Sequence, residues 1–306
     1  MTSLKHWFVI INPTSGNGSC KKKWAQIESL LAANDFTFEY AFTEYAKHSV
    51  NLVQNVINQG FKKIICVGGD GTLHNIINGI MSQSIVPTSE INVGVIPIGT
   101  GNDWVKTHHI PNNIVRAIEI IKRGTIKIQD VGKITLSNNQ IPPVFFMNLA
   151  GIGFDGYVVS KVGKYKSIGA MAYLFGTLMG LFYFKNFNSE MAINSEVIKT
   201  KTLMILVGLC NYSGGGMQLT KSPNPFDGLF DVSIAKDLNK VDIITNVSKL
   251  FNGSIVNHPK IDSYKTTEID VKVASEKHQF IQADGELIGT GNFKVSIIKK
   301  GFSFYG

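Results

Sequence analysis

Two glycine-rich segments constrain the fold of this chain most strongly, because each stands between a strand-like run and a helical pattern. Gly68–Thr72 reads Gly-Gly-Asp-Gly-Thr and follows the apolar run 63–67, and Pro97–Asp103 follows the apolar run 91–96. Glycines let backbone N–H groups approach a polyanion that larger side chains would block, and a helix N-terminus beyond each loop adds partial positive charge. The two segments therefore predict loops that bind nucleotide phosphates.

Asp70 stands at the centre of the first segment. Its negative charge cannot serve to attract phosphate. A carboxylate in this position is suited to holding Mg²⁺ or to orienting the groups around a reacting phosphate. The loops therefore predict a nucleotide, with Asp70 either as a ligand of Mg²⁺ or as the residue that orients the reacting groups.

Residues 7–130 alternate between strand-like and helical patterns. Apolar or alternating runs predict strands at 7–11, 36–42, 63–67 and 91–96, and apolar residues at helical spacing predict helices around 24–31, 50–57, 73–80 and 114–121. This alternation predicts an α/β domain whose parallel sheet is covered by helices on both faces. Ligands of such sheets bind at the carboxyl ends of the strands, where both glycine segments lie.

The pattern changes near residue 126, after which short β-rich segments are separated by turns. They are 127–135, 144–149, 190–198, 201–209, 228–234, 267–273 and 280–283. This spacing is typical of an antiparallel sandwich or barrel. We therefore predict a nucleotide-binding domain at 1–126, completed by the C-terminal segment 290–306, and a second domain at 127–289.

Composition excludes several classes of protein. An apolar content of 44% and a charged content of 17% fit a globular chain with a substantial core. The three cysteines are widely spaced and indicate neither a disulfide framework nor a metal site. The first residues lack the pattern of a signal peptide, which predicts a cytoplasmic location. The net charge of +8 suits anionic lipid or polyphosphate, but with only two arginines it disfavours sequence-specific binding of nucleic acid.

One segment, 168–184, carries no charge over its whole length and is flanked by Lys164, Lys166 and Lys185. It is at the short limit for a membrane-spanning helix and contains three glycines. Three interpretations remain open: a membrane-spanning helix, a core helix, and a helix that lines an apolar ligand cleft or touches the bilayer.

Six sequence blocks occur in an order that resembles the diacylglycerol kinase catalytic family, especially its soluble bacterial lipid kinases. Sphingosine and ceramide kinases share this family. The resemblance covers roughly residues 7–304, and its blocks are 12–16, 68–72, 97–103, 148–155, 214–231 and 284–286. One departure is His74-Asn75, where the family usually has Asn-Glu.

The resemblance implies an α/β domain followed by a β-sandwich domain that binds lipid and metal, with the active site between them. It implies that Glu286 is the proton acceptor and that Asp284, Asp70 and Asp103 are catalytic carboxylates. A Mg²⁺ would be held by the side chain of Asp227 and by the carbonyl oxygens of Asn224 and Leu229. The residues implied to hold ATP are Asn12, Pro13, Thr14, Ser15, Gly16, Thr43, Gly68, Gly69, Asp70, Gly71, Thr72, Leu73 and Thr100.

Asp284 and Glu286 are two residues apart on a strand-like run, which predicts that their side chains share one face. One carboxylate could take a proton while the other orients it or holds the catalytic metal. Taken alone, Asp-Gly-Glu predicts a hairpin turn. The other motifs favour the carboxylate pair.

We therefore expect a kinase that uses ATP and Mg²⁺ to phosphorylate a lipid hydroxyl, such as that of diacylglycerol, at the membrane surface. Two alternatives remain: a kinase of a soluble acceptor that is similar to NAD kinase, and a module that binds lipid or nucleotide without catalysis. The expected partner is the lipid substrate, with peripheral membrane association and no nucleic acid. A homodimer also stays open.

Overall fold

The computed structural model describes residues 6–137, 141–162, 184–274 and 279–306. The uncharged segment 168–184 lies outside these residues except for Phe184. The chain divides into two compact units, the first formed by Met1–Gln129 with Lys300–Gly306 and the second by Asp130–Lys299. The sequence analysis had placed these divisions after residues 126 and 289.

The first unit contains a parallel sheet in the strand order β15-β4-β3-β1-β2. Apolar residues run continuously through its central strands because both of their faces are buried. The predicted α/β architecture of this part of the chain is confirmed. The strands are β1 His6–Ile11, β2 Thr37–Phe42, β3 Lys63–Gly68, β4 Asn92–Pro97 and the end of β15, Phe293–Tyr305.

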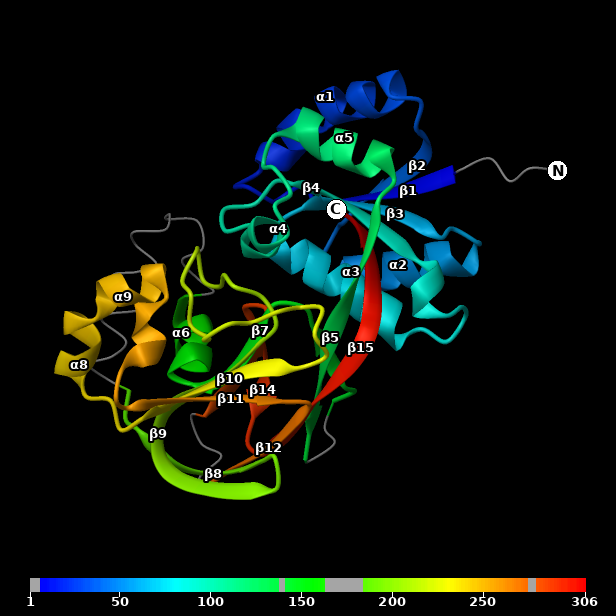
Figure 1. Ribbon diagram of the computed structural model, residues 1–306. Coiled ribbons are helices and arrows are strands. Elements are labelled where there is room, and N and C mark those ends of the chain that lie inside the picture. Colours follow the sequence, from blue (N-terminus) through cyan, green and yellow to red (C-terminus); the bar gives the residue numbers. More distant parts are fainter. Residues whose placement is uncertain (1–5, 138–140, 163–183, 275–278) are drawn as a thin grey trace. The chain divides into compact units, whose positions relative to one another are not determined.

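Helices cover both faces of this sheet, with α1 and α5 on one face and α2 and α3 on the other (Figure 1). Val9 and Ile11 of β1 pack in one core cluster with Ile27 of α1 and Ile118 of α5. The alternate residues of β1 are also buried and face the opposite side of the sheet. The helices are α1 Ser19–Ala33, α2 His48–Asn58, α3 Asp70–Ser82, η1 Thr88–Glu90, α4 Asp103–Thr107 and α5 Ile114–Arg123.

The second unit is an antiparallel β structure, as predicted. Its strands follow the order β14-β13-β7-β9-β8-β12-β15, while β10 pairs with β9 and β11, and β5 pairs with β6. The strands are β5 Ile126–Leu136, β6 Val144–Phe146, β7 Leu149–Gly153, β8 Phe187–Ile193, β9 Glu196–Gly208, β10 Phe230–Lys236, β11 Ile261–Thr266, β12 Glu268–Val273, β13 Phe280–Ala283 and β14 Glu286–Thr290. Its helices are α6 Phe154–Val162, α8 Lys240–Thr245, α9 Val247–Asn252 and η2 Ser254–Asn257.

The expected strand 190–198 was wrong, because the chain turns back within it. Asn194 and Ser195 have positive φ angles of 49° and 69° and join β8 to β9 as an antiparallel hairpin. Positive φ at both central residues is the geometry that matches the twist of paired strands. The sequence analysis also missed α8, which begins with a capping box between Asn239 and Asp242.

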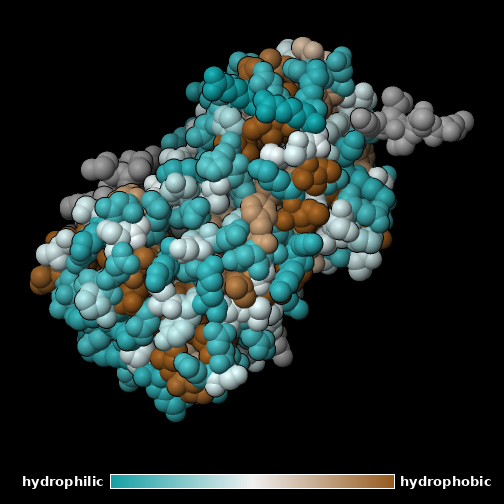
Figure 2. All heavy atoms as spheres, viewed as in Figure 1, coloured by the Kyte–Doolittle hydropathy of each residue, from teal (hydrophilic) through white to brown (hydrophobic). Residues whose placement is uncertain are grey.

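Hydrophilic residues predominate on the face shown in Figure 2, and the hydrophobic residues there form small separate groups. Isolated apolar side chains on a surface are normal for a globular protein. Among the described residues, no helix has both the length and the apolar character needed to cross a membrane.

Candidate active site

Asp70 connects the two glycine loops of the first unit. It is the first residue of α3, directly after the loop that follows β3. Its Oδ2 accepts a hydrogen bond from the backbone N–H of Asp103 at 3.0 Å, and its Oδ1 accepts one from that of Trp104 at 3.3 Å. The carboxylate is therefore fixed at the point where α3 and α4 both begin.

The two loops approach each other backbone to backbone. A β-carbon at Gly99 would lie 2.7 Å from the Cα of Gly69, closer than real β-carbons come. A β-carbon at Gly101 would lie 3.3 Å from Oδ2 of Asp70 and 3.7 Å from Oδ2 of Asp103. Glycine is required at position 99 for this packing, and the carboxylates of Asp70 and Asp103 border the same space beside Gly101.

The loop after β1 joins the same edge of the sheet. Asn12 donates from Nδ2 to Oγ1 of Thr72 at 3.0 Å, and its Oδ1 accepts from the N–H and hydroxyl of Thr14 at 3.1 and 2.8 Å. The hydroxyl of Ser15 lies 3.5 Å from that of Thr72. The loops that follow β1, β3 and β4 are thus brought together. Pro13 and Gly16 lie in the first of these loops, while Gly68 ends β3 and Gly71 lies in the first turn of α3.

Three other residues predicted to hold the nucleotide differ in their placement. Thr43 directly follows β2, where its N–H donates to the carbonyl of Ile11 at 2.8 Å, and Thr100 is exposed in the loop after β4. Both lie at the carboxyl edge of the sheet. The side chain of Leu73 is buried and its N–H donates to the carbonyl of Gly69 at 3.2 Å. The side chain of Leu73 therefore packs in the core, and its backbone N–H supports the loop.

The donors around Gly101 fit a Mg²⁺ ion that also binds phosphate. Among the described residues, no group of three or more His, Cys, Asp or Glu side chains could hold a metal by itself. Mg²⁺ in nucleotide sites is usually held by one or two carboxylates together with phosphate oxygens and water. Asp70 and Asp103 supply two carboxylates at the edge where the glycine loops meet.

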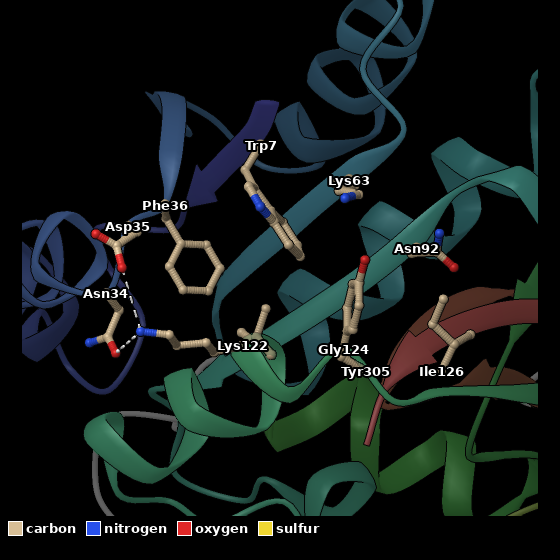
Figure 3. A pocket seen from close by; sticks show the side chains of 11 residues that line it. Trp7, Asn34, Asp35, Phe36, Lys63, Asn92, Lys122, Gly124, Ile126 and Tyr305 are labelled. Atoms are coloured by element: carbon tan, nitrogen blue, oxygen red, sulfur yellow. Dashed lines mark hydrogen bonds and ion pairs between the residues drawn. The ribbon is translucent and has the colours of Figure 1, made fainter. Parts of the chain in front are cut away.

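A pocket of about 350 Å³ lies elsewhere in the first unit (Figure 3). Trp7, Lys63 and Asn92 line it, and these residues stand at the beginnings of β1, β3 and β4. The rings of Phe36 and Tyr305 form more of its wall. It is therefore at the amino ends of the strands, opposite the glycine loops, and does not belong to the candidate nucleotide site.

The segment around Glu286 in the second unit is a hairpin turn, so the prediction that Asp284 and Glu286 share a strand face was wrong. Asp284 and Gly285 have positive φ angles of 50° and 80° and join β13 to β14, with Ala283 opposite Glu286. Two positive φ angles in a two-residue loop are typical of a type I′ turn. The carboxylates are separated by the reversal of the chain.

The turn gives the two carboxylates different environments. Asp284 accepts hydrogen bonds from the backbone N–H groups of Met147, Asn148 and Leu149 at 3.1, 3.0 and 3.1 Å. Glu286, the first residue of β14, is partly exposed. Asp284 therefore fastens the turn to the start of β7 through three backbone donors, whereas Glu286 begins the next strand.

Asp155 was not predicted as a site residue, although it belongs to one of the six blocks. It lies in the first turn of α6, where its Oδ2 accepts a hydrogen bond from Nε2 of Gln282. Burial raises the pKa of Asp155 to about 6, and the hydrogen bond from Gln282 partly opposes this rise. A carboxyl group with such a pKa next to the turn is a candidate functional residue.

The pKa of Asp155 predicts how its replacement changes stability with pH. Because the folded chain binds this proton more tightly, the carboxyl group stabilises the fold most below about pH 4 and loses that effect as pH rises through about 6. We expect Asp155→Asn to match the wild type near pH 4 and to exceed its free energy of unfolding by up to about 2 kcal/mol at pH 7. Urea unfolding of both proteins at the two pH values measures this, and a difference that does not vary with pH would contradict it.

The predicted metal turn at 224–229 already contains a cation. Oδ2 of Asp227 pairs with the ammonium of Lys265 at 2.9 Å, and its Oδ1 accepts from the N–H of Leu229 at 3.0 Å. The carbonyl of Asn224 accepts from the N–H of Asp227 at 3.4 Å. Both oxygens of the carboxylate that would hold the Mg²⁺ ion therefore already have partners within the chain.

Two buried carboxylates that the sequence analysis did not assign hold this region in place. Oδ2 of Asp130 accepts from the N–H of Gly228 at 2.7 Å. Asp231 accepts from the N–H groups of Lys221 and Ser222 at 2.9 and 3.2 Å. Both aspartates are 2% exposed, and their backbone partners explain how the charges are accommodated.

Comparison with known protein families agrees with these features. Residues 6–134 match the diacylglycerol kinase catalytic domain, and residues 148–301 match the YegS C-terminal NAD kinase beta sandwich-like domain. The chain belongs to the diacylglycerol kinase catalytic-domain family. The resemblance inferred from six sequence blocks is thereby confirmed, and family membership places the chain among the kinases.

Relatives of this kinase family match almost the whole chain. A diacylglycerol kinase of Staphylococcus saprophyticus is 29% identical over 289 residues, which cover 93% of this chain and 90% of the relative. A diacylglycerol kinase of Bacillus subtilis strain 168 is also 29% identical over 289 residues, covering 94% and 91%.

Solved structures share the fold. A structure from Bacillus anthracis strain Sterne has a TM-score of 0.79 at 25% identity and covers 100% of this chain and 98% of its own. A diacylglycerol kinase from the same strain has a TM-score of 0.75 at 23% identity with the same coverage. The predicted fold class, an α/β domain followed by an antiparallel β-sandwich domain, is confirmed.

Proposed function

We propose that the protein transfers the γ-phosphoryl group of ATP to a lipid hydroxyl in a Mg²⁺-dependent reaction. The observation that carries this proposal is the pair of carboxylates, Asp70 and Asp103, beside Gly101 where the glycine loops meet at the carboxyl edge of the sheet. Such an edge is where nucleotides bind in α/β folds. The relatives named diacylglycerol kinase support a lipid acceptor.

The residues divide the work of phosphoryl transfer as follows. Backbone N–H groups of the glycine loops would bind the phosphates, and Asp70 and Asp103 would hold the metal. Bound Mg²⁺ neutralises charge on the phosphate oxygens. Glu286 accepts the proton of the lipid hydroxyl as its oxygen bonds to the γ-phosphorus and the bond to ADP breaks. Asp284 holds the turn that carries Glu286.

Purified protein tests the proposal when it is incubated with γ-labelled ATP and Mg²⁺ and offered detergent-dispersed lipid alcohols or NAD as acceptors. We expect label in a lipid, with diacylglycerol as the first acceptor to test, and no transfer when EDTA removes the metal. Label in NAD alone would establish a soluble acceptor. ATP binding without transfer to any acceptor would indicate a non-catalytic module.

Association with a lipid surface should depend on salt. The net charge of +8 attracts the protein to anionic lipid, at about 1 kcal/mol for each basic residue that comes close to the surface. We expect co-sedimentation with phosphatidylglycerol vesicles to fall as NaCl rises from about 0.05 to 0.5 M, because the attraction is screened. Phosphatidylcholine vesicles are the control, and binding to both lipids that ignores salt would contradict an electrostatic attraction.

A further inference from the structure

A chain of hydrogen bonds through the buried side chain of Gln282 reaches the Asp284–Gly285 turn from the side of α6. Gln282, which is 2% exposed in β13, donates from Nε2 to Oδ2 of Asp155. The other end of the same amide, Oε1, accepts from the backbone N–H of Gly285 at 2.8 Å. Asp155, Gln282 and the turn are thus linked in series.

The local backbone is built to admit this chain. A β-carbon at Gly151, the residue paired with Gln282 across β7 and β13, would lie 2.6 Å from Oδ2 of Asp155. A β-carbon at Gly156 would lie 2.0 Å from the carbonyl oxygen of Phe280. Glycine at both positions lets α6 begin against β13, which brings the carboxylate of Asp155 to the amide of Gln282.

The chemistry of the three groups sets the direction of the chain. The N–H of Gly285 can only donate, so it requires the oxygen end of the Gln282 amide. The nitrogen end then needs an acceptor, and an ionised carboxylate offers acceptors only. Asp155 therefore fixes the orientation of the Gln282 amide, and that amide fixes the Asp284–Gly285 peptide in the turn that leads to Glu286.

We propose that Asp155 and Gln282 are positioning residues that hold the Gly285 peptide, and through it the carboxylate of Glu286, in the geometry needed for proton transfer. The inference rests on the proposed function, in which Glu286 accepts the proton of the lipid hydroxyl. Asp284 fastens its own side chain to the backbone at 147–149, whereas Gln282 fastens the backbone of the turn. Together these contacts restrict the conformation of the two-residue loop formed by Asp284 and Gly285.

Steady-state kinetics test the positioning role. We expect Asp155→Ala and Gln282→Met each to lower kcat about tenfold or more, since small displacements of catalytic groups are costly, while the KM for ATP stays unchanged. The double variant should be no slower than the slower single variant, because both act through one chain. Asp155→Asn, which keeps an acceptor oxygen, should stay within about threefold of the wild type.

Ser189→Ala is the matched control, because the hydroxyl of Ser189 pairs with that of Thr202 at 2.7 Å and both residues are buried in the same unit. This variant also loses a buried hydrogen bond and should retain kcat. Gln282→Met keeps the length and approximate volume of the side chain but removes its amide. It therefore still tests the proposal if Asp155→Ala does not fold. Full kcat in Gln282→Met, or losses that add in the double variant, would overturn the proposal.

Amide hydrogen exchange at Gly285 gives a readout that does not depend on activity. We expect faster exchange at Gly285 in Asp155→Ala and Gln282→Met, and wild-type exchange in Asp155→Asn and Ser189→Ala. Unchanged exchange in Gln282→Met would overturn the positioning role whatever the activity. A wild-type protein that transfers no phosphoryl group, but in which exchange at Gly285 responds as expected, would instead show that the proposed function has failed.

Discussion

Glu286→Gln should lower kcat for lipid phosphorylation by about 10²–10⁴-fold, the usual cost of losing a general base. Glutamine keeps the shape of the side chain and removes its basicity, so the hairpin at Asp284–Gly285 should persist. The dissociation constant for ATP should change little, because the predicted phosphate loops belong to the other unit. Single-turnover rates with labelled ATP, together with equilibrium binding of ATP, measure the two quantities separately.

A surface glutamate of the same unit provides the matched control. Glu268 is exposed at the start of β12, where it pairs with Lys294 at 2.8 Å, so Glu268→Gln removes a carboxylate without touching the turn. This variant should retain wild-type turnover. Near-normal turnover in Glu286→Gln would remove Glu286 from the mechanism.

Asp70→Asn should also reduce turnover by about 100-fold or more. An uncharged amide cannot attract Mg²⁺ as a carboxylate does, and the metal would then no longer offset the negative charge that develops on the phosphate. The structure adds a second, smaller effect. Asparagine offers one oxygen for two backbone donors, so either the N–H of Asp103 or that of Trp104 would face an NH₂ group. We expect a loss of about 1–2 kcal/mol in the free energy of unfolding.

The dependence on Mg²⁺ separates the two effects of Asp70→Asn. A lost metal ligand should raise the Mg²⁺ concentration needed for half-maximal turnover, whereas a purely structural change should not. Asp35→Asn is the control, since its side chain is 93% exposed and its positive φ of 65° suits asparagine equally well. If Asp70→Asn instead unfolds at assay temperature, Asp70 is chiefly structural and its assignment to the metal is wrong.

The regular elements of the first unit could be predicted because their cause is local. A helical stripe such as Leu73, Ile76, Ile77 and Ile80 appears in the sequence as spacing, and α3 buries these residues. The hairpin at Asn194-Ser195 escaped prediction because neither residue is glycine, although both adopt positive φ. The residues on either side of this turn include β-branched ones, so the whole segment 190–198 was interpreted as one continuous strand.

The partners of the site residues could not be predicted, because they depend on pairing between distant parts of the chain. Asp70 finds its two N–H donors 33 and 34 positions away, at the start of α4. Asp284 finds its donors at 147–149, across the pairing of β13 with β7. Spacing within a motif shows which functional groups are present. The sheet register decides which of the carboxylates is fixed by distant backbone N–H donors.

The end of β15 has a consequence for the order of folding. Ser303 and Phe304 pair with β4, Phe304 is fully buried, and the ring of Tyr305 lies 5.2 Å from that of Trp7. The part of β15 that pairs with β4 is therefore synthesised after the whole second unit. During translation the β4 edge stays unpaired, where it could pair wrongly with another strand, until Ser303 and Phe304 have emerged from the ribosome. Of the two units, the one whose synthesis begins first therefore completes its sheet only after the second unit has been synthesised.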